Sequence, residues 1–256
     1  MNYGVIIVQI QQAVKEASRI MLSAKRVEES VSSKEGHANF VTTYDKKVQE
    51  QLKARLLEIL PEAHFCGEEG EDAATDINKG YVYIVDPIDG TTNFIKDFKV
   101  SAISVGLAHN GHMKAGVVYN PYLDEMFSAV AGQGAYLNGN PIHVSKAPLS
   151  EALVIFGTSP YNQELAERSF RLAYEYFTQA MDVRRTGSAA LDLCSIASGR
   201  AELYFELILQ PWDYAAGSLI VEEAGGRVTT VDEEPIRFDQ PCSIMAVGKG
   251  VKNLSK

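Results

Sequence analysis

The chain has 256 residues, of which 46% are hydrophobic and 22% charged, a balance typical of a folded globular protein and not of a disordered one. Its formal net charge is −9, and its densest cationic sites are only dyads, such as Arg184-Arg185. We therefore expect no direct binding to nucleic acid or to a membrane. Residues 1–24 lack a basic leading region and are interrupted by polar side chains, so they do not resemble a signal peptide, and we expect a cytoplasmic protein.

The first elements predicted along the chain are two helices. Apolar residues recur at three- and four-residue spacing over residues 6–21, which predicts a long amphipathic helix. Residues 28–39 are polar and lack periodicity, which indicates a mobile loop. Thr42 or Thr43 could cap a second helix, and Pro61 ends it.

Residues 81–144 change to short β-rich runs, and the pair Asn110-Gly111 is typical of a tight hairpin. Beyond about residue 150, strand and helix patterns alternate. The predicted elements there are strand 153–157, helices 164–177 and 188–198, strand 201–206, helix 212–224 and strands near Val228 and Ile244. This pattern predicts a layered α/β (α+β) fold, and the lack of a linker predicts a single unit, 1–256, with halves of about 1–145 and 146–256.

The stretch with the most chemical information is Asp86-Pro87-Ile88-Asp89-Gly90-Thr91-Thr92, directly after the apolar run 81–85. It places two carboxylates three residues apart at the end of a predicted strand, where functional groups collect in α/β proteins. The small residues that follow leave backbone N–H groups accessible to an anion such as phosphate.

Two further acids belong to separate segments, Glu68 in Gly67-Glu68-Glu69 and Asp213 after Trp212. If four carboxylates converge, each pair at ~5 Å repels by roughly 3 kcal/mol, so the cluster needs protons or cations. An all-oxygen set suits Mg²⁺ and, less well, Mn²⁺ or Ca²⁺, but not zinc. The alternative is that each acid only caps a turn or a helix.

These segments resemble the signature motifs of the inositol monophosphatase family, in the expected order over nearly the whole chain. The matching segments are Val41-Thr42-Thr43-Tyr44-Asp45, Gly67-Glu68-Glu69, the stretch from Asp86 to Phe94, Gly187-Ser188-Ala189-Ala190-Leu191-Asp192-Leu193, Trp212-Asp213-Tyr214-Ala215-Ala216-Gly217 and Glu223-Ala224-Gly225-Gly226. The resemblance implies a sugar-phosphatase αβαβα sandwich with mixed and antiparallel sheets. It also implies a Mg²⁺-dependent phosphomonoesterase that is inhibited by lithium and forms a homodimer.

The resemblance also implies a metal site. Glu68, Asp86 and the backbone carbonyl of Ile88 would hold one Mg²⁺ ion, and Asp86, Asp89 and Asp213 would hold a second. The family uses two or three Mg²⁺ ions per site, Mn²⁺ is a possible substitute, and Li⁺ is inhibitory. Asp86 would bridge the two ions.

By the same resemblance, Glu68 and Thr91 would orient and deprotonate the attacking water in an in-line displacement at phosphorus. Asp45 would accept a hydrogen bond from the Thr91 hydroxyl. The backbone N–H groups of Gly90 and Thr91 would bind the phosphate oxygens, so that positioning and electrostatics supply most of the catalysis.

Three more positions resemble family residues with roles at the substrate. Glu206 and the backbone of Ala189 would contact substrate hydroxyls, and Lys34 would belong to a lid over the site. The alternative for Glu206 is a solvated strand end, and for Lys34 an ordinary exposed lysine. Residues 95–99 depart from the family by lacking its usual His and Pro.

The function expected from this resemblance is hydrolysis of a small phosphorylated polyol, inositol 1-phosphate above all. Glu206 favours a neutral polyhydroxylated group over a second phosphate, which a carboxylate would repel. The alternatives on the same fold are 3′-phosphoadenosine 5′-phosphate, fructose 1,6-bisphosphate, NADP or a sugar phosphate as substrate. An alternative of another class is a regulatory, protein-binding role, as in bacterial relatives that act on the transcription machinery.

Overall fold

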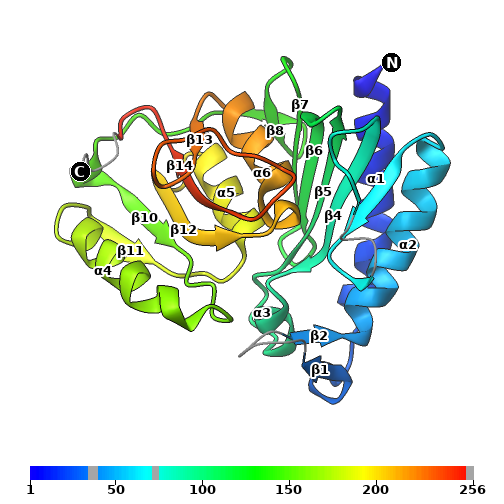
Figure 1. The fold of residues 1–256 in the computed structure, drawn as a ribbon, viewed down its shortest axis with the longest axis horizontal. Helices are drawn as coiled ribbons and strands as arrows, with labels where there is room; N and C mark the ends of the chain where they lie inside the picture. Colours follow the sequence, from blue (N-terminus) through cyan, green and yellow to red (C-terminus); the bar gives the residue numbers. More distant parts are fainter. Residues whose placement is uncertain (34–39, 71–74, 252–256) are drawn as a thin grey trace.

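The computed structural model describes residues 1–33, 40–70 and 75–251. Its helices and sheets alternate in five layers, which confirms the predicted αβαβα sandwich (Figure 1). Within the described part of the chain, no helix is both long enough and apolar enough to cross a membrane.

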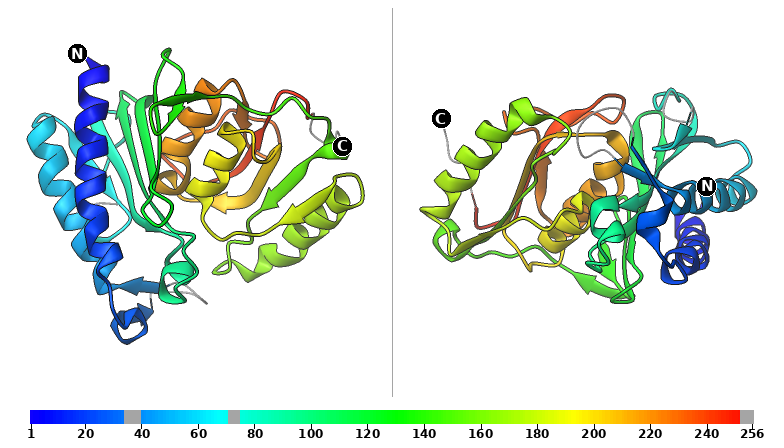
Figure 2. Two further views of the ribbon diagram at one scale, coloured as in Figure 1. Left: turned by 180° about the vertical axis from the view of Figure 1, so that it is seen from behind. Right: turned by 90° about the horizontal axis from the view of Figure 1, so that it is seen from below.

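The outer helices and the central helices are arranged around two sheets. Helices α1 (Tyr3–Leu22) and α2 (Thr43–Ile59) cover the outer face of a seven-stranded sheet. Helices α5 (Ala189–Ala197) and α6 (Pro211–Glu223) lie between that sheet and a five-stranded one, whose other face is covered by α4 (Ala166–Phe177) (Figure 2). Both sheets therefore have their inner faces on the same pair of helices.

The seven-stranded sheet is antiparallel except at one edge, where β3 and β4 run parallel. Its strands, in spatial order, are β3 (His64–Gly67), β4 (Tyr81–Asp89), β5 (Ala102–His109), β6 (His112–Asn120), β7 (Glu125–Val130), β8 (Ala135–Leu137) and β9 (Asn140–Ile142). The predicted hairpin at Asn110-Gly111 is confirmed, because His109 pairs with His112. Both turn residues have positive φ, 50° and 77°, as a type I′ turn requires.

The five-stranded sheet is mixed. Its strands, in spatial order, are β11 (Asp182–Arg184), β10 (Leu153–Phe156), β12 (Leu203–Leu209), β14 (Cys242–Val247) and β13 (Arg227–Thr229). Strand β10 runs parallel to both of its neighbours, whereas β14 runs antiparallel to both of its own. The parallel strands β10 and β12 therefore end at the same edge, where the chain turns toward α4 and α6.

Thr42, and not Thr43, caps the second helix. Its hydroxyl accepts hydrogen bonds from the backbone N–H groups of Tyr44 (3.1 Å) and Asp45 (3.4 Å). The carboxylate of Asp45 in turn accepts from the Thr42 backbone N–H at 2.8 Å. This reciprocal capping box fixes Asp45 at the start of α2.

The expectation of a mobile loop over residues 28–39 is wrong for its first part. A 3-10 helix spans Val27–Ser30, and β1 (Val31–Ser33) pairs antiparallel with β2 (Phe40–Thr42). Residues 34–39 lie outside the described residues. Hydrophobic periodicity missed the pair because so short a strand is stabilised by backbone hydrogen bonds, which leave no pattern of side chains.

Small residues let α6 approach its neighbours closely. A Cβ on Gly116 of β6 would lie 2.8 Å from the Ala216 carbonyl oxygen, and a Cβ on Gly217 would lie 2.7 Å from a methyl carbon of Leu193. Ala215 and Ala216 are fully buried. The sequence Ala-Ala-Gly therefore brings the beginning of α6 against the seven-stranded sheet.

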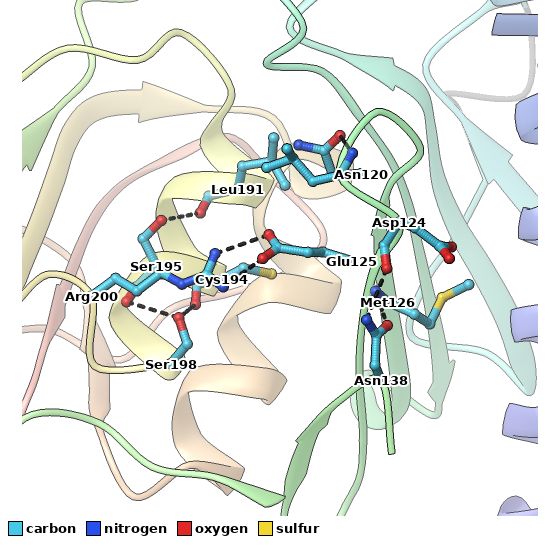
Figure 3. A network of polar contacts seen from close by, with 11 residues as sticks. Asn120, Asp124, Glu125, Met126, Asn138, Leu191, Cys194, Ser195, Ser198 and Arg200 are labelled. Atoms are coloured by element: carbon cyan, nitrogen blue, oxygen red, sulfur yellow. Dashed lines mark hydrogen bonds and ion pairs between the residues drawn. The ribbon is translucent and has the colours of Figure 1, made fainter. Parts of the chain in front are cut away.

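An ion pair joins strand β7 of that sheet to the turn that follows α5 (Figure 3). Arg200 donates to both carboxylate oxygens of Glu125 on β7, at 2.9 Å and 2.5 Å, and its guanidinium lies 5.8 Å from the centre of the Phe127 ring. The hydroxyl of Ser198, just after α5, donates to the Cys194 carbonyl at 2.8 Å. This network holds layers together and contributes no residue to the cavity described below.

Candidate active site

A cavity of about 460 Å³ opens where the ends of β4, β10 and β12 meet the first turns of α5 and α6. Nine of the residues predicted for the site line it, namely Glu68, Asp86, Ile88, Asp89, Gly90, Thr91, Ala189, Glu206 and Asp213. Asp45 does not line the cavity, and Lys34 lies outside the described residues. The fold thus gathers side chains that are far apart in the sequence.

The pairing of β3 with β4 explains why Glu68 meets the acids of β4. The two strands are parallel, with Gly67 opposite Val85, so they end at the same edge of the sheet. The backbone N–H of Glu68 extends the pairing by donating to the Val85 carbonyl at 3.2 Å. Asp86 is the next residue on the neighbouring strand, and the two acids therefore lie together.

The end of β4 bends sharply at a glycine. The register with β5 shifts between Asp86 and Asp89, and Gly90 follows with φ of 86°. A Cβ at Gly90 would lie 2.9 Å from the Val100 carbonyl oxygen, so only glycine fits this turn. The chain then enters the short helix α3 (Thr91–Ile95), which the sequence analysis missed, and Thr91 is its first residue.

Three acids of the cluster, Asp86, Asp89 and Asp213, also have a structural hydrogen bond. Asp86 accepts from the backbone N–H two residues later at 2.9 Å, and Asp213 accepts from the N–H at the cap of α6 at 2.8 Å. Asp89 accepts from the Ser188 hydroxyl and from a backbone N–H of α5 at 2.8 Å. The turn and cap roles are therefore real, and each of these bonds uses one oxygen of its carboxylate.

Among the described residues, no group of three His, Cys, Asp or Glu side chains is already placed so that it could hold a metal ion. The chemistry of the donors nevertheless fits a hard cation. Burial, followed by the charges of nearby acids, raises the pKa values of Asp86 and Asp213 well above the usual range. Burial also raises the pKa of Asp89 to about 7. A buried set of oxygen ligands with this excess of negative charge matches what Mg²⁺ requires.

The expected hydrogen bond between Thr91 and Asp45 is present. The Thr91 hydroxyl lies 3.3 Å from Asp45 Oδ1 and 3.2 Å from the Ile88 carbonyl oxygen, either of which can accept its proton. Asp45 itself is fully buried, and its other oxygen accepts from the Thr42 hydroxyl at 2.5 Å. Burial raises the pKa of Asp45 to about 7. The capping box of α2 thus holds the carboxylate that orients Thr91.

The model of the inositol monophosphatase family matches residues 3–253 of this chain. The chain belongs to the inositol monophosphatase family. Nus factor SuhB of Vibrio cholerae is 37% identical over 87% of this chain and 83% of its own length. Inositol-1-monophosphatase of Bacillus subtilis is 32% identical over 91% and 88%. The solved structure of the extragenic suppressor protein suhB from Bartonella henselae superposes with a TM-score of 0.86, at 32% identity, and covers 96% of this chain and 95% of its own.

Glu206, which this family resemblance places at substrate hydroxyls, is buried. Its Oε1 accepts from the backbone N–H and the hydroxyl of Ser159, at 2.8 Å and 2.9 Å, and its Oε2 accepts from the Tyr204 hydroxyl at 2.8 Å. Only 8% of Glu206 is exposed, so the alternative of a solvated strand end is wrong. Its contact with substrate stays a prediction.

Sequence reasoning missed several residues of the cavity wall. Ser188 and Asp192 lie within a motif that was recognised, but they received no role. Tyr161 and Arg185 belong to no such motif, and the only available cue for Tyr161 is its place in a loop that follows a strand. The Ser188 hydroxyl donates a hydrogen bond to Asp89 at the end of β4. This bond connects the motif that contains Ser188, in the second half of the chain, to the wall of the cavity formed by β4.

Proposed function

We propose that this chain is a Mg²⁺-dependent phosphatase that hydrolyses the monoester of a small phosphorylated polyol, with inositol 1-phosphate as the first candidate. The observation that supports it most strongly is the cavity, in which Glu68, Asp86, Asp89 and Asp213 lie beside Thr91 and the Gly90 turn. Membership of the inositol monophosphatase family supports the same reaction class.

In this proposal the carboxylates of Glu68 and Asp86 and the carbonyl of Ile88 hold one Mg²⁺, and Asp86, Asp89 and Asp213 hold another. The ions supply a more acidic water and a counter-charge for the leaving oxygen. The hydrogen bonds now made by Asp86 and Asp213 run to backbone N–H groups, and each engages only one oxygen. Coordination can therefore use the remaining oxygens without loss of the turn or the cap.

The protein's own groups then orient the nucleophile. Glu68 and Thr91 are proposed to hold a water in line with the phosphorus and to take its proton, with the proton of the Thr91 hydroxyl passing to Asp45. Asp45 accepts from the Thr91 hydroxyl and so sets the direction of the hydroxyl lone pairs. The N–H groups of Gly90 and Thr91 are proposed to bind the phosphate oxygens, because the first N–H groups of a helix have no acceptor within it.

The charge of the cavity supports a neutral alcohol as leaving group. Its described lining contains six carboxylates, Glu68, Asp86, Asp89, Asp192, Glu206 and Asp213, and a single cation, Arg185. One acid outside the proposed ligand set, Glu206, accepts hydrogen bonds at both of its oxygens, as a carboxylate does, and would repel a second phosphate. Fructose 1,6-bisphosphate, 3′-phosphoadenosine 5′-phosphate and NADP, each with further phosphate groups, are therefore less favoured than an inositol or sugar monophosphate.

A related protein widens the set of candidate alcohols. Inositol monophosphatase II of Staphylococcus aureus, whose solved structures are 28% and 31% identical to this chain at TM-scores of 0.80 and 0.79, binds inositol monophosphate and 2′AMP. Both ligands carry one phosphate on a hydroxylated ring, as the charge of this cavity favours. We therefore include 2′AMP among the candidate substrates.

One relative, 37% identical to this chain, is named Nus factor SuhB. That name favours a second candidate function, a regulatory protein-binding role on the same fold. Because the proposed ligands are all retained, this role would accompany catalysis and not replace it. By membership of the family we also propose inhibition by Li⁺, activity with Mn²⁺, a homodimer and a cytoplasmic location. Analytical ultracentrifugation tests the dimer directly.

The test of the proposed function is phosphate release from a panel of esters, with and without Mg²⁺. The panel contains inositol 1-phosphate, 2′AMP, fructose 1,6-bisphosphate, 3′-phosphoadenosine 5′-phosphate and NADP. We expect Mg²⁺-dependent release with the largest kcat/KM for a monophosphate of a neutral ring. Release that is independent of Mg²⁺, or a preference for the bisphosphate, would contradict the proposal.

A further inference from the structure

The turn that follows β10, in the second half of the chain, has an unusual backbone conformation. Ser159 follows β10 and has φ of 40°, a left-handed conformation that is unfavourable for a serine. The next residues, Pro160, Tyr161 and Asn162, line the cavity, and the Asn162 N–H closes the turn by donating to the Ser159 carbonyl at 2.7 Å. A strained residue persists only where its surroundings hold it in place.

Buried hydrogen bonds hold Ser159. Its backbone N–H and its hydroxyl both bond to Oε1 of Glu206, and the same hydroxyl lies 2.6 Å from the Ile208 carbonyl oxygen. Only 1% of Ser159 is exposed. The carboxylate of Glu206 is itself fixed by the hydroxyl of Tyr204, which is fully buried. Glu206 is thus the anchor of the turn, with both of its oxygens engaged.

The turn presents Tyr161 to the cavity. Tyr161 is half-buried, and among the described residues its hydroxyl has no hydrogen-bond partner. Burial, and then the negative charges of Asp213, Glu206 and other acids of the site, raise the pKa of this phenol, so it remains a neutral donor. An aromatic ring with one available O–H group is suited to a hydroxylated ring, and the negative charge of the nearby acids disfavours an anion at this place.

We propose that Tyr161 is a specificity-determining residue that contacts the leaving alcohol, and that Ser159 and Glu206 are the positioning residues that hold it there. This inference rests on the proposed function, since it takes the phosphate to be bound at Gly90 and Thr91. The alcohol class it selects is a cyclic polyol or another hydroxylated ring: the ring of Tyr161 covers its apolar face, and the phenol donates to one of its hydroxyls. Glu206 then has a positioning role through Ser159 in addition to its predicted contact with substrate.

The test compares two esters in Mg²⁺-loaded protein: inositol 1-phosphate, and methyl phosphate, whose leaving group is too small to reach Tyr161. Tyr161→Phe removes one neutral hydrogen bond and is expected to lower kcat/KM for inositol 1-phosphate by about 3- to 10-fold. Tyr161→Ala also removes the ring and is expected to lower it by roughly 30-fold or more. Both losses should appear mainly in KM, whereas methyl phosphate should be hydrolysed at the parent rate.

Two further variants separate positioning from stability. Ser159→Gly accepts the left-handed backbone but removes the hydroxyl, and it should raise KM for inositol 1-phosphate by about 3-fold without an effect on methyl phosphate. Tyr174→Phe, on the exposed face of α4, is the matched control and should change neither ester. If the Tyr161 variants change both esters equally, or neither, the inference is overturned while the proposed function stands. If the parent protein hydrolyses neither ester, the proposed function fails and this inference fails with it.

Discussion

The two walls of the cavity are built differently. The wall from β3, β4 and α3 takes its acids and Thr91 from two short segments that are adjacent through strand pairing. The wall from the second half is assembled from turns after β10 and β12 and from the first turn of α5, held by buried side-chain bonds such as Ser159 to Glu206. The acids of the first wall, together with Asp213 of α6, suit the proposed metal chemistry, and the turns of the second wall suit the choice of alcohol. Variants in the two walls should therefore fail in different ways.

The largest expected effect is in the first wall. Asp89→Asn should lower kcat for inositol 1-phosphate by roughly 1,000-fold, because a bound metal ion supplies several kcal/mol of transition-state stabilisation. The fold should persist, since an amide oxygen can still accept the bonds from Ser188 and α5. Steady-state kinetics and thermal unfolding measure both quantities. Asp97→Asn is the control, because Asp97 is an exposed acid outside the cavity. If Asp89→Asn hydrolyses the ester at the parent rate, the assignment of metal ligands is wrong.

The next effect concerns the hydroxyl that Asp45 orients. Thr91→Ala should lower kcat by about 100-fold with little change in KM, because it removes the hydroxyl that we propose positions and deprotonates the nucleophile. Thr91→Ser keeps the hydroxyl and should recover most of the rate. Equal rates in the alanine and serine variants would indicate that this hydroxyl has no part in catalysis.

Two buried acids, Asp89 of the first wall and Asp45 behind it on α2, also predict how stability depends on pH. The pKa values of Asp45 and Asp89 rise on folding from 3.8 to about 7, so the folded protein binds protons more tightly than the unfolded chain. Their contribution to the stability of the metal-free protein is fully present below about pH 3.8 and is lost progressively as the pH rises from there through about 7. The thermal midpoint of metal-free protein should therefore fall between pH 5 and pH 8.

Addition of Mg²⁺ should offset this fall, and should do so more at pH 8 than at pH 5, because binding of the cation competes with binding of protons. Differential scanning calorimetry with EDTA and with Mg²⁺ measures the difference. A midpoint that rises with pH in EDTA, or an effect of Mg²⁺ that is the same at both pH values, would contradict the proposed cluster.

The smallest effect is expected away from both walls. Glu125→Gln weakens the bidentate ion pair with Arg200. Because both side chains of this pair are partly exposed, the variant should destabilise the protein by only about 1 kcal/mol. For a chain of this length that corresponds to a fall in the thermal midpoint of roughly 2–4 °C. Because the network does not line the cavity, kcat/KM should stay at the parent value. A change in kcat/KM without a change in the thermal midpoint would mean that this ion pair is energetically coupled to the active site.

The two walls also differ in how far the sequence predicts them. Asp86 and Asp89 stand together in the chain, and Glu68 and Asp213 stand in motifs with recognisable neighbours, so the acids could be predicted. The turn at Ser159 could not, because its conformation depends on a carboxylate 47 residues later and on the burial of both. The same reason explains the missed pair of β1 and β2, whose stability lies in backbone pairing. Long helices such as α1 were predictable, since their apolar face repeats along the sequence.

The most direct test of the central claim is phosphate release from inositol 1-phosphate by metal-stripped protein as Mg²⁺ is returned. The account predicts no measurable release before Mg²⁺ is added, a saturable recovery with Mg²⁺, and no recovery in Asp89→Asn at the same concentrations. Release at the full rate in the metal-stripped parent would contradict the claim that these carboxylates act by holding a cation.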